Sequence, residues 1–423
     1  MSTTNQTKEK IFSRYEAFVI TILSLLQFSI ILDFMVLSPL GAMLLPELHI
    51  TTSQFGLVVS AYAFSAAASG ILAAGFADKF DRKKLLLFFY TGFMLGTVLC
   101  ALAPDYYFLL AARIVTGIFG GVIGSISFAI ISDLFKYEVR GRVMGFVQMS
   151  FAASQILGLP IGLVLANSFG WHSPFWMIAI LGTALGVVIL LYLRPVDAHL
   201  HAKSDRNAFT HLIKTFSMPD YLKAFICTSL LATGGFMLMP FGSAFSTNNL
   251  GLTMEQLPMI YGITGIFSIA TGPLIGKLSD RIGKFKVFVY GSIIAIITVA
   301  IFTPLGITPI WAVIAINVVM FTGVSSRMIS SSALVSAIPA PADRGAFMSI
   351  NASVQQVAGG IASALAGVIV TQSPTGLLIG YPLLGYVVIG SMIITIMLMY
   401  WIDRHVKSLT KTQPAPVVIE EAA

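Results

Sequence analysis

The stretch 276–286, GKLSDRIGKFK, lies between two long apolar runs. A near-copy, AGFADKFDRKK at 74–84, stands 202 residues earlier and is also flanked by apolar runs. A second pair of segments, RGRVM at 140–144 and RGAFM at 344–348, repeats at a spacing of 204 residues. Short basic loops that recur at half-chain spacing between apolar segments predict a duplicated bundle of membrane-spanning helices.

The composition also indicates a protein that is solvated by lipid. Of the 423 residues 57% are hydrophobic and 10% are charged, and the mean hydropathy is +0.89. A soluble domain carries about 25% charged residues, so this chain lacks the polar surface that water requires. The two cysteines, Cys100 and Cys227, fall inside apolar runs. We read them as small buried hydrophobic residues and not as a disulfide or a metal site.

Twelve apolar runs are long enough to cross about 30 Å of hydrocarbon. The predicted spans are 18–43, 54–77, 85–102, 108–132, 143–166, 174–193, 220–245, 255–276, 287–303, 310–335, 346–370 and 378–402. The fold class is therefore an all-α integral membrane protein with twelve transmembrane helices in two pseudo-symmetric six-helix bundles.

The polar segments divide this chain into domains. We expect a cytoplasmic tail at 1–17, a first bundle at 18–193, a cytoplasmic linker at 194–219, a second bundle at 220–402 and a disordered tail at 403–423. The linker contains three histidines but no metal-ligand spacing, so neither a metal site nor a cofactor is expected.

The distribution of positive charge predicts the topology. Of the 25 Lys and Arg residues, 23 lie in or next to the tails and loops on one side of the twelve spans, and none lies on the other side. Positive residues concentrate in cytoplasmic loops, so both termini should be cytoplasmic in a multi-pass plasma membrane protein, which we take to be a bacterial inner membrane protein. This pattern also explains the net charge of +7 without nucleic-acid binding.

The loop 276–286 resembles the G-x-L-x-D-R-x-G-R/K signature of major facilitator superfamily transporters, and the resemblance covers nearly the whole chain. The resemblance implies that the loop helps to lock the cytoplasmic gate. The alternative is that its basic residues only set the membrane topology. The residues that the resemblance assigns to the gate are Asp78, Arg82, Asp280, Arg281 and Lys284. Asp78 can act at the positive N-terminus of the eleventh span.

The first copy of this loop departs from the signature at two positions. Ala74 and Asp81 stand where the pattern has glycine. Glycine takes a positive φ angle without steric cost, so the tight turn of the signature is not expected at Asp81.

The fourth span carries Arg113, which is followed by Gly117, Gly120 and Gly121. This arrangement resembles a family motif associated with proton-coupled members. A guanidinium that faces lipid costs several kcal/mol, so Arg113 should face the bundle interior or a watery cavity. A structural arginine that bonds backbone carbonyls is the alternative.

Asp33 is the acidic residue that lies well inside a span, and its depth differs from that of Arg113 by only ~5 Å. The two can pair directly or through water. Burial favours the neutral carboxyl and the guanidinium favours the carboxylate, so protonation can fall near physiological pH, as a proton-coupling site requires. A permanent ion pair that holds the helices together is the alternative.

The fifth span carries Gly158, Pro160 and Gly162, which resemble, in shortened form, a Gly-Pro-rich signature of the family's exporters. Proline removes one helical hydrogen bond and glycine allows close approach or bending. Ala152 and Ser154 stand where the full pattern has further glycines. The motif suggests antiport.

Substrate contacts are expected on the second bundle. Arg327 has no acidic partner within the spans, which makes it a candidate for an anionic or polar group of the substrate, unless it snorkels to the interface. Phe236, Met237 and Phe241 would form an adaptable apolar wall, or else ordinary packing. Asn317 would bond the substrate or cross-link helices.

The chain most resembles the twelve-helix drug:proton antiporters and arabinose-efflux-like permeases. We therefore expect a monomeric secondary transporter that works by alternating access, with protons and the lipid bilayer as its other partners. It would export a drug, a sugar or an amphipathic metabolite. Open alternatives are proton-coupled import, lysolipid or organic-anion transport, and a non-transporting membrane sensor. No ATP-binding loop and no nucleophile–base pair stands out, so an enzyme is not expected.

Overall fold

The computed structural model describes residues 12–73, 77–197, 200, 213–339 and 343–412. Twelve segments within these residues are helical, long and apolar enough to cross a membrane. The all-α fold with twelve spans is therefore confirmed.

The first half of the chain forms six spans, of which the fifth is interrupted. They are α1 Arg14–Val36, α3 Thr52–Ala73, α4 Arg82–Leu102, α5 Tyr106–Leu134, the run α6 Tyr137–Ala153, η2 Ser154–Gly158 and α7 Leu159–Phe169, and α8 Ser173–Tyr192. The short helices α2 Gly41–Glu47 and η1 Ala77–Lys79 lie between spans. Local chemistry fixes several starts: Ser13 and Glu16 form a capping box for α1, and Asp105 accepts from the Phe108 amide at 2.9 Å.

The second half forms six further spans, of which the first is also interrupted. They are α10 Pro219–Leu238 with η4 Met239–Phe241 and α11 Gly242–Asn248, α12 Leu257–Ile282 preceded by η5 Met254–Gln256, α13 Lys284–Phe302, α14 Ile310–Val335, α15 Arg344–Ile369, and α16 Tyr381–Thr412. The strands β1 Thr371–Gln372 and β2 Leu378–Ile379 form an antiparallel hairpin before α16.

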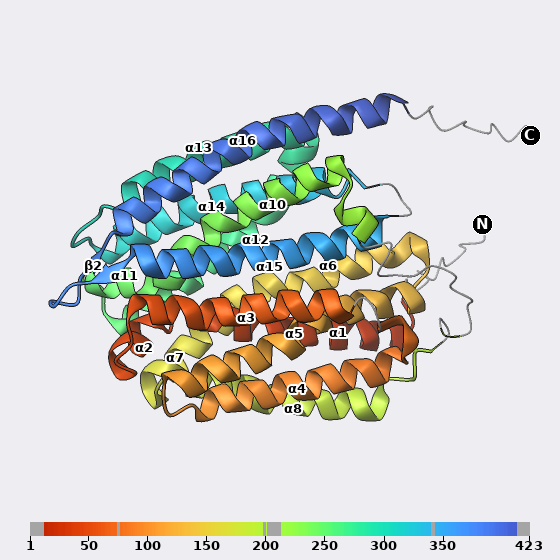
Figure 1. The fold of residues 1–423 in the computed structure, drawn as a ribbon, viewed down its shortest axis with the longest axis horizontal. Coiled ribbons are helices and arrows are strands. Elements are labelled where there is room, and N and C mark those ends of the chain that lie inside the picture. Colours follow the sequence, from red (N-terminus) through yellow and green to blue (C-terminus); the bar gives the residue numbers. More distant parts are fainter. Residues whose placement is uncertain (1–11, 74–76, 198–199, 201–212, 340–342, 413–423) are drawn as a thin grey trace, which may run out of the picture.

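The two halves lie side by side as separate bundles (Figure 1). Helices of the first half occupy the lower part of the view and those of the second half the upper part, and α3 and α15 meet at the boundary. The start of α1 and the end of α16 lie at the same end, which we call the terminal end. The opposite end, which holds α2, α11 and the hairpin, is called the distal end.

Small residues allow the helices within each bundle to approach closely. A Cβ at Gly121 on α5 would lie 2.4 Å from the Ala66 carbonyl oxygen on α3, and one at Gly291 on α13 would lie 2.9 Å from the Gly323 carbonyl oxygen on α14. No larger side chain fits at such positions without moving a helix. These glycines therefore lie at packing seams between neighbouring helices.

Hydrogen bonds between described residues join the two halves at mid-depth and toward the distal end. The donor and acceptor residues, in order, are Thr52 and Val370, Ser53 and Gly367 (3.1 Å), Ser60 and Gly360 (2.8 Å), Asn167 and Met254 (3.0 Å), and Ser243 and Ser38 (3.1 Å). The rings of Phe55 and Phe241 pack edge to face across the same end, with centroids 5.8 Å apart. In this conformation the distal end is closed.

The two copies of the basic loop turn in different ways. Gly283 is the single residue between α12 and α13, and its φ of +102° is strained for any residue with a side chain. Asp81 has a φ of −54° and accepts from the Lys83 amide at 2.7 Å, so it caps α4. The first copy therefore replaces a glycine turn with a side-chain cap.

Candidate functional site

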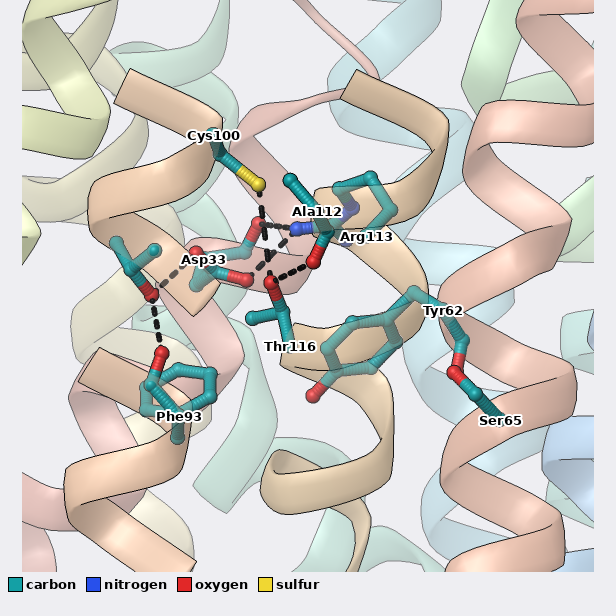
Figure 2. Close-up of polar contacts among 9 residues, drawn as sticks. Asp33, Tyr62, Ser65, Phe93, Cys100, Ala112, Arg113 and Thr116 are labelled. Carbon is teal, nitrogen blue, oxygen red and sulfur yellow. Dashed lines mark hydrogen bonds and ion pairs between the residues drawn. The ribbon is translucent and has the colours of Figure 1, made fainter. Parts of the chain in front are cut away.

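The centre of the first bundle contains a buried ion pair. Asp33 projects from α1 and Arg113 from α5, and Nη1 of Arg113 donates to Oδ2 of Asp33 at 2.7 Å. The other carboxylate oxygen accepts from the Thr97 hydroxyl on α4 at 3.1 Å. Neither charged side chain is more than 1% exposed. Figure 2 shows the two side chains pointing toward each other between their helices.

An aromatic ring covers the guanidinium of this pair. The guanidinium carbon of Arg113 lies 4.6 Å from the centroid of the Tyr62 ring on α3, and Figure 2 shows the ring beside the arginine. Thr116, one turn beyond Arg113, contacts the Cys100 thiol at 3.7 Å and donates to the Ala112 carbonyl. The pair is thus enclosed by α1, α3, α4 and α5.

Glycines on α4 and α5 make this enclosure possible. A Cβ at Gly96 would lie 2.7 Å from the Thr116 hydroxyl, and one at Gly120 would lie 2.8 Å from the Tyr62 hydroxyl. Two charges that leave water incur a desolvation cost that only good geometry and further hydrogen bonds offset. The close helix packing supplies that geometry.

The sequence predicts that Asp33 and Arg113 can lie close together, and the structure places both side chains in the bundle interior. It does not single out Thr97 or Tyr62. A threonine and a tyrosine in apolar spans are common, so neither type is a signal by itself.

A chain of aromatic rings leads from the ion pair to the second half. Tyr62 packs against Phe34 with centroids 5.2 Å apart, and Phe34 packs against Phe236 of α10 at 5.6 Å. Phe236 in turn fills the space above Gly359 on α15, where a Cβ would lie 2.8 Å from its ring. The residue next to Asp33 therefore touches the opposite bundle.

The Gly-Pro motif of the fifth span packs against the part of α1 that carries Asp33. The regular α-helix gives way to the π-helix η2 at Ser154–Gly158, and Pro160 stands in the first turn of α7. A Cβ at Gly158 would lie 2.5 Å from the Leu32 side chain. A Cβ at Gly162 would lie 3.2 Å from Val36. π-helical turns are often found at functional sites.

The other residues expected to bind substrate do not gather around the ion pair. Phe241 is fully buried against Phe55 in the closed distal end, and Met237 is buried in the core. The amide of Asn317 donates to the Val313 carbonyl of its own helix at 2.9 Å.

Arg327 lies inside the second bundle and does not snorkel. It is 4% exposed, its Nη1 donates to the Ser292 hydroxyl on α13 at 3.2 Å, and its guanidinium lies 5.3 Å from the Phe288 ring centroid.

Arg82, one of the residues assigned to the gate, contacts two residues of its own half. Arg82 forms an ion pair with Asp133 at 3.2 Å and donates to the Ala77 carbonyl. Asp280 and Arg281 are exposed, and Lys284 is partly exposed. The side chain of Asp78 lies outside the described residues.

A largely apolar cavity of about 640 Å³ lies away from the ion pair, toward the terminal end. It is formed by α10, α15 and the terminal part of α3, with the hydroxyls of Ser229, Thr233 and Ser353 among aliphatic side chains such as Ile71 and Ile361. Its lining comes from both halves of the chain.

Comparison with known proteins places this chain in a family. The model of the Major Facilitator Superfamily matches residues 23–362 and 224–421. The uncharacterized MFS-type transporter YceJ of Bacillus subtilis (strain 168) is 30% identical over 269 residues, which are 62% of this chain and 67% of that protein. The uncharacterized MFS-type transporter YwfA of the same organism is 26% identical over 259 residues, or 60% of this chain and 61% of that protein.

Solved structures share the fold. A bacterial homologue of the human lysosomal transporter Spinster, crystallised in an inward-facing and unoccupied conformation, has a TM-score of 0.69 at 17% identity, over 96% of this chain and 100% of that one. A structure of the nucleoside transporter NupG has a TM-score of 0.71 at 17% identity, over 91% of this chain and 99% of that one.

Proposed function

Because the chain belongs to the Major Facilitator Superfamily and is therefore a multi-pass membrane transporter, we propose that it exchanges protons for a small amphipathic molecule, which it exports by alternating access. The observation that carries this proposal is the buried Asp33–Arg113 pair. A carboxylate held at 2.7 Å from a guanidinium, with no exposure to solvent, is a group whose protonation changes the balance of forces between two helices.

The proposed coupling step is the protonation of Asp33. A neutral carboxyl holds Arg113 less strongly, so the contacts among α1, α3 and α5 can rearrange. Tyr62 contacts Arg113 of this pair and packs against Phe34, and Phe34 packs against Phe236. Movement at the pair can therefore reach the boundary between the bundles, where α3 packs on α15.

The orientation in the membrane is also a proposal. The excess of positive charge on one side of the spans supports cytoplasmic termini in a bacterial inner membrane. With that orientation the closed distal end faces outward, and we propose that this conformation opens toward the cytoplasm. In the opposite conformation Asp78, Arg82, Asp280, Arg281 and Lys284 would close the cytoplasmic end.

The cavity and the fifth span support the proposed class of cargo. A largely apolar lining with a few hydroxyls suits an amphipathic molecule of low polarity. The Gly-Pro motif that packs on the Asp33 helix favours exchange over symport. The ion pair and the cavity are each formed by residues of one chain, and we propose that the protein acts as a monomer.

The test is a flux measurement on purified full-length protein in proteoliposomes that contain a pH-sensitive dye. A pH gradient is imposed in one direction and then in the other. The cationic amphipathic dye ethidium, a lysolipid and a nucleoside are added in turn. Antiport moves cargo against the direction of proton flow. Accumulation of cargo in the same direction as protons would establish import by symport. Failure to move protons or any labelled compound would favour a sensor.

A further inference from the structure

The second bundle contains a buried positive charge with no carboxylate beside it. Arg327 is 4% exposed, and no ion pair joins it to a residue in the described part of the chain. Of the acidic residues of the second half that the structure describes, Asp220, Glu255, Asp280 and Asp343 stand at or near helix ends. Asp403 lies within α16 and accepts from Lys407 at 2.6 Å.

The contacts that Arg327 makes are too few for an arginine in a membrane interior. A guanidinium has five N–H donors, and one of them bonds the neutral hydroxyl of Ser292. The Phe288 ring, 5.3 Å away, adds a weak cation–π contact. One hydrogen bond to a neutral hydroxyl and one aromatic ring do not offset the cost of an uncompensated buried charge.

A second polar group near Arg327 also lacks a partner. The hydroxyl of Ser330 is fully buried and makes no hydrogen bond with any described residue. Ser330 follows Arg327 by three residues on α14, so both lie on the same face of the helix. Ser292 already donates its own hydroxyl hydrogen to the Phe288 carbonyl at 2.8 Å, whereas the Ser330 hydrogen is available for an acceptor.

The first bundle shows what such an arginine requires. Arg113 is on the fourth span of its bundle and Arg327 is on the fourth span of the other. Each guanidinium lies over an aromatic ring, Tyr62 or Phe288. Asp33 supplies the negative charge for Arg113 from within the chain. The equivalent charge for Arg327 is missing from the described residues.

We propose that Arg327 and Ser330 bind a monovalent anionic group inside the second bundle. The group is either a free halide such as chloride or the carboxylate of a cargo molecule, and the second case rests on the proposed transport function. One guanidinium balances one negative charge, so a doubly charged phosphate would keep an uncompensated charge. The N–H donors of Arg327 and the Ser330 O–H would both donate to the bound anion.

The test is the thermal unfolding of the full-length protein in detergent at constant ionic strength, with sodium gluconate replaced stepwise by chloride, bromide or acetate. The wild-type protein is expected to show a saturable rise in Tm with at least one of them. Arg327→Gln should raise the half-saturating concentration at least tenfold. Ser330→Ala should raise it about three- to tenfold, which is the loss of one charge-assisted hydrogen bond.

Arg404→Gln is the matched control, because it removes the same charge from an exposed position on α16 of the same half. It should leave the half-saturating concentration unchanged. A response to halides identifies a free ion, and a response to acetate alone identifies a carboxylate site; either outcome supports the proposal. The absence of a saturable response in the wild type, or an equal response in Arg327→Gln, overturns it.

A second measurement covers the case in which Arg327→Gln does not fold. Crystals of the wild-type protein soaked in bromide should give an anomalous peak about 3.5 Å from the Arg327 guanidinium, provided that the site takes halides. If the protein responds to acetate but shows no bromide peak, Arg327→Lys tests the site. This variant keeps the positive charge and loses the planar set of N–H donors of the guanidinium. Neither assay needs a proton gradient, so a failure here is distinct from a failure of proton coupling.

Discussion

The Oδ2 atom of Asp33 lies 2.7 Å from Nη1 of Arg113 in a site that solvent does not reach. The carboxylate is well satisfied, because Thr97 donates to its other oxygen. The guanidinium is not, since its Nε makes no hydrogen bond with a described residue. A pair built for stability alone would satisfy both partners. The unsatisfied donor costs stability, which fits the coupling role proposed for this pair.

Replacement of the carboxyl should separate transport from coupling. Asp33→Asn keeps the shape and the hydrogen bond from Thr97 but cannot exchange a proton. We expect gradient-driven flux to fall at least tenfold, while exchange of cargo without a gradient persists. Proteoliposome flux measurements with and without a pH gradient report both. Glu47→Gln, which removes an exposed carboxylate from α2, is the control. Wild-type pumping by Asp33→Asn would reject the coupling role.

Removal of the arginine should be more damaging to the fold than removal of the acid. Arg113→Gln leaves the Asp33 carboxylate buried and unpaired, which costs about 3–5 kcal/mol when one partner of a buried pair is lost. The double variant Asp33→Asn/Arg113→Gln has no charge left to bury and should recover part of that loss. Unfolding in detergent measures the free energies of unfolding of Asp33→Asn, Arg113→Gln and the double variant. A double variant no more stable than Arg113→Gln would contradict this account.

How far the sequence predicts this molecule depends on the kind of signal. Charge and hydropathy predict twelve spans because a segment in lipid must be apolar and must satisfy its backbone hydrogen bonds internally. Asp33 and Arg113 stand out because charged residues are rare within spans. Thr97 and Tyr62 do not stand out, since their types are ordinary in a helix. The pattern also places Phe241 in a substrate wall, whereas the structure buries it against Phe55. Which faces of two helices meet depends on packing that one sequence does not display.

We expect stability and transport to depend on the aromatic face of Tyr62 more than on its hydroxyl. Tyr62→Phe keeps a ring over Arg113 and should transport at near the wild-type rate. Tyr62→Leu loses a cation–π contact of about 0.5–2 kcal/mol and the contact with Phe34, so both stability and flux should fall. A double-mutant cycle with Arg113→Lys isolates the coupling energy. A coupling energy near zero would remove Tyr62 from the site.

The orientation can be tested because both native cysteines are buried and should not react with polar reagents. Ile307 is 91% exposed in the distal loop between α13 and α14, and Lys286 is exposed at the terminal end of α13. A membrane-impermeant maleimide added to intact cells should label Ile307→Cys and should reach Lys286→Cys after permeabilisation. The reverse order of labelling would place the termini outside.

The close contact between α3 and α15 should control the equilibrium between conformations. A Cβ at Gly56 would lie 2.7 Å from the Ser363 carbonyl oxygen and 3.2 Å from the Cα of Gly367. Gly56→Val therefore cannot fit the closed distal end without moving a helix, at a cost of about 1–3 kcal/mol. Such a cost shifts a two-state equilibrium by roughly 5- to 150-fold toward the conformation that separates these helices.

Spin labels at Glu47→Cys and Ile307→Cys, one on each half of the distal end, report this shift as a longer distance between them. Gly390→Val is the matched control, because a Cβ at Gly390 on α16 meets nothing within 4 Å. The control should keep the wild-type distance distribution, and Gly56→Val should lose its short component. If both variants keep the short distance, the seam between α3 and α15 does not hold the distal end closed. The closure would then have to rest on the contacts of α2 and α11, such as the hydrogen bond from Ser243 to Ser38.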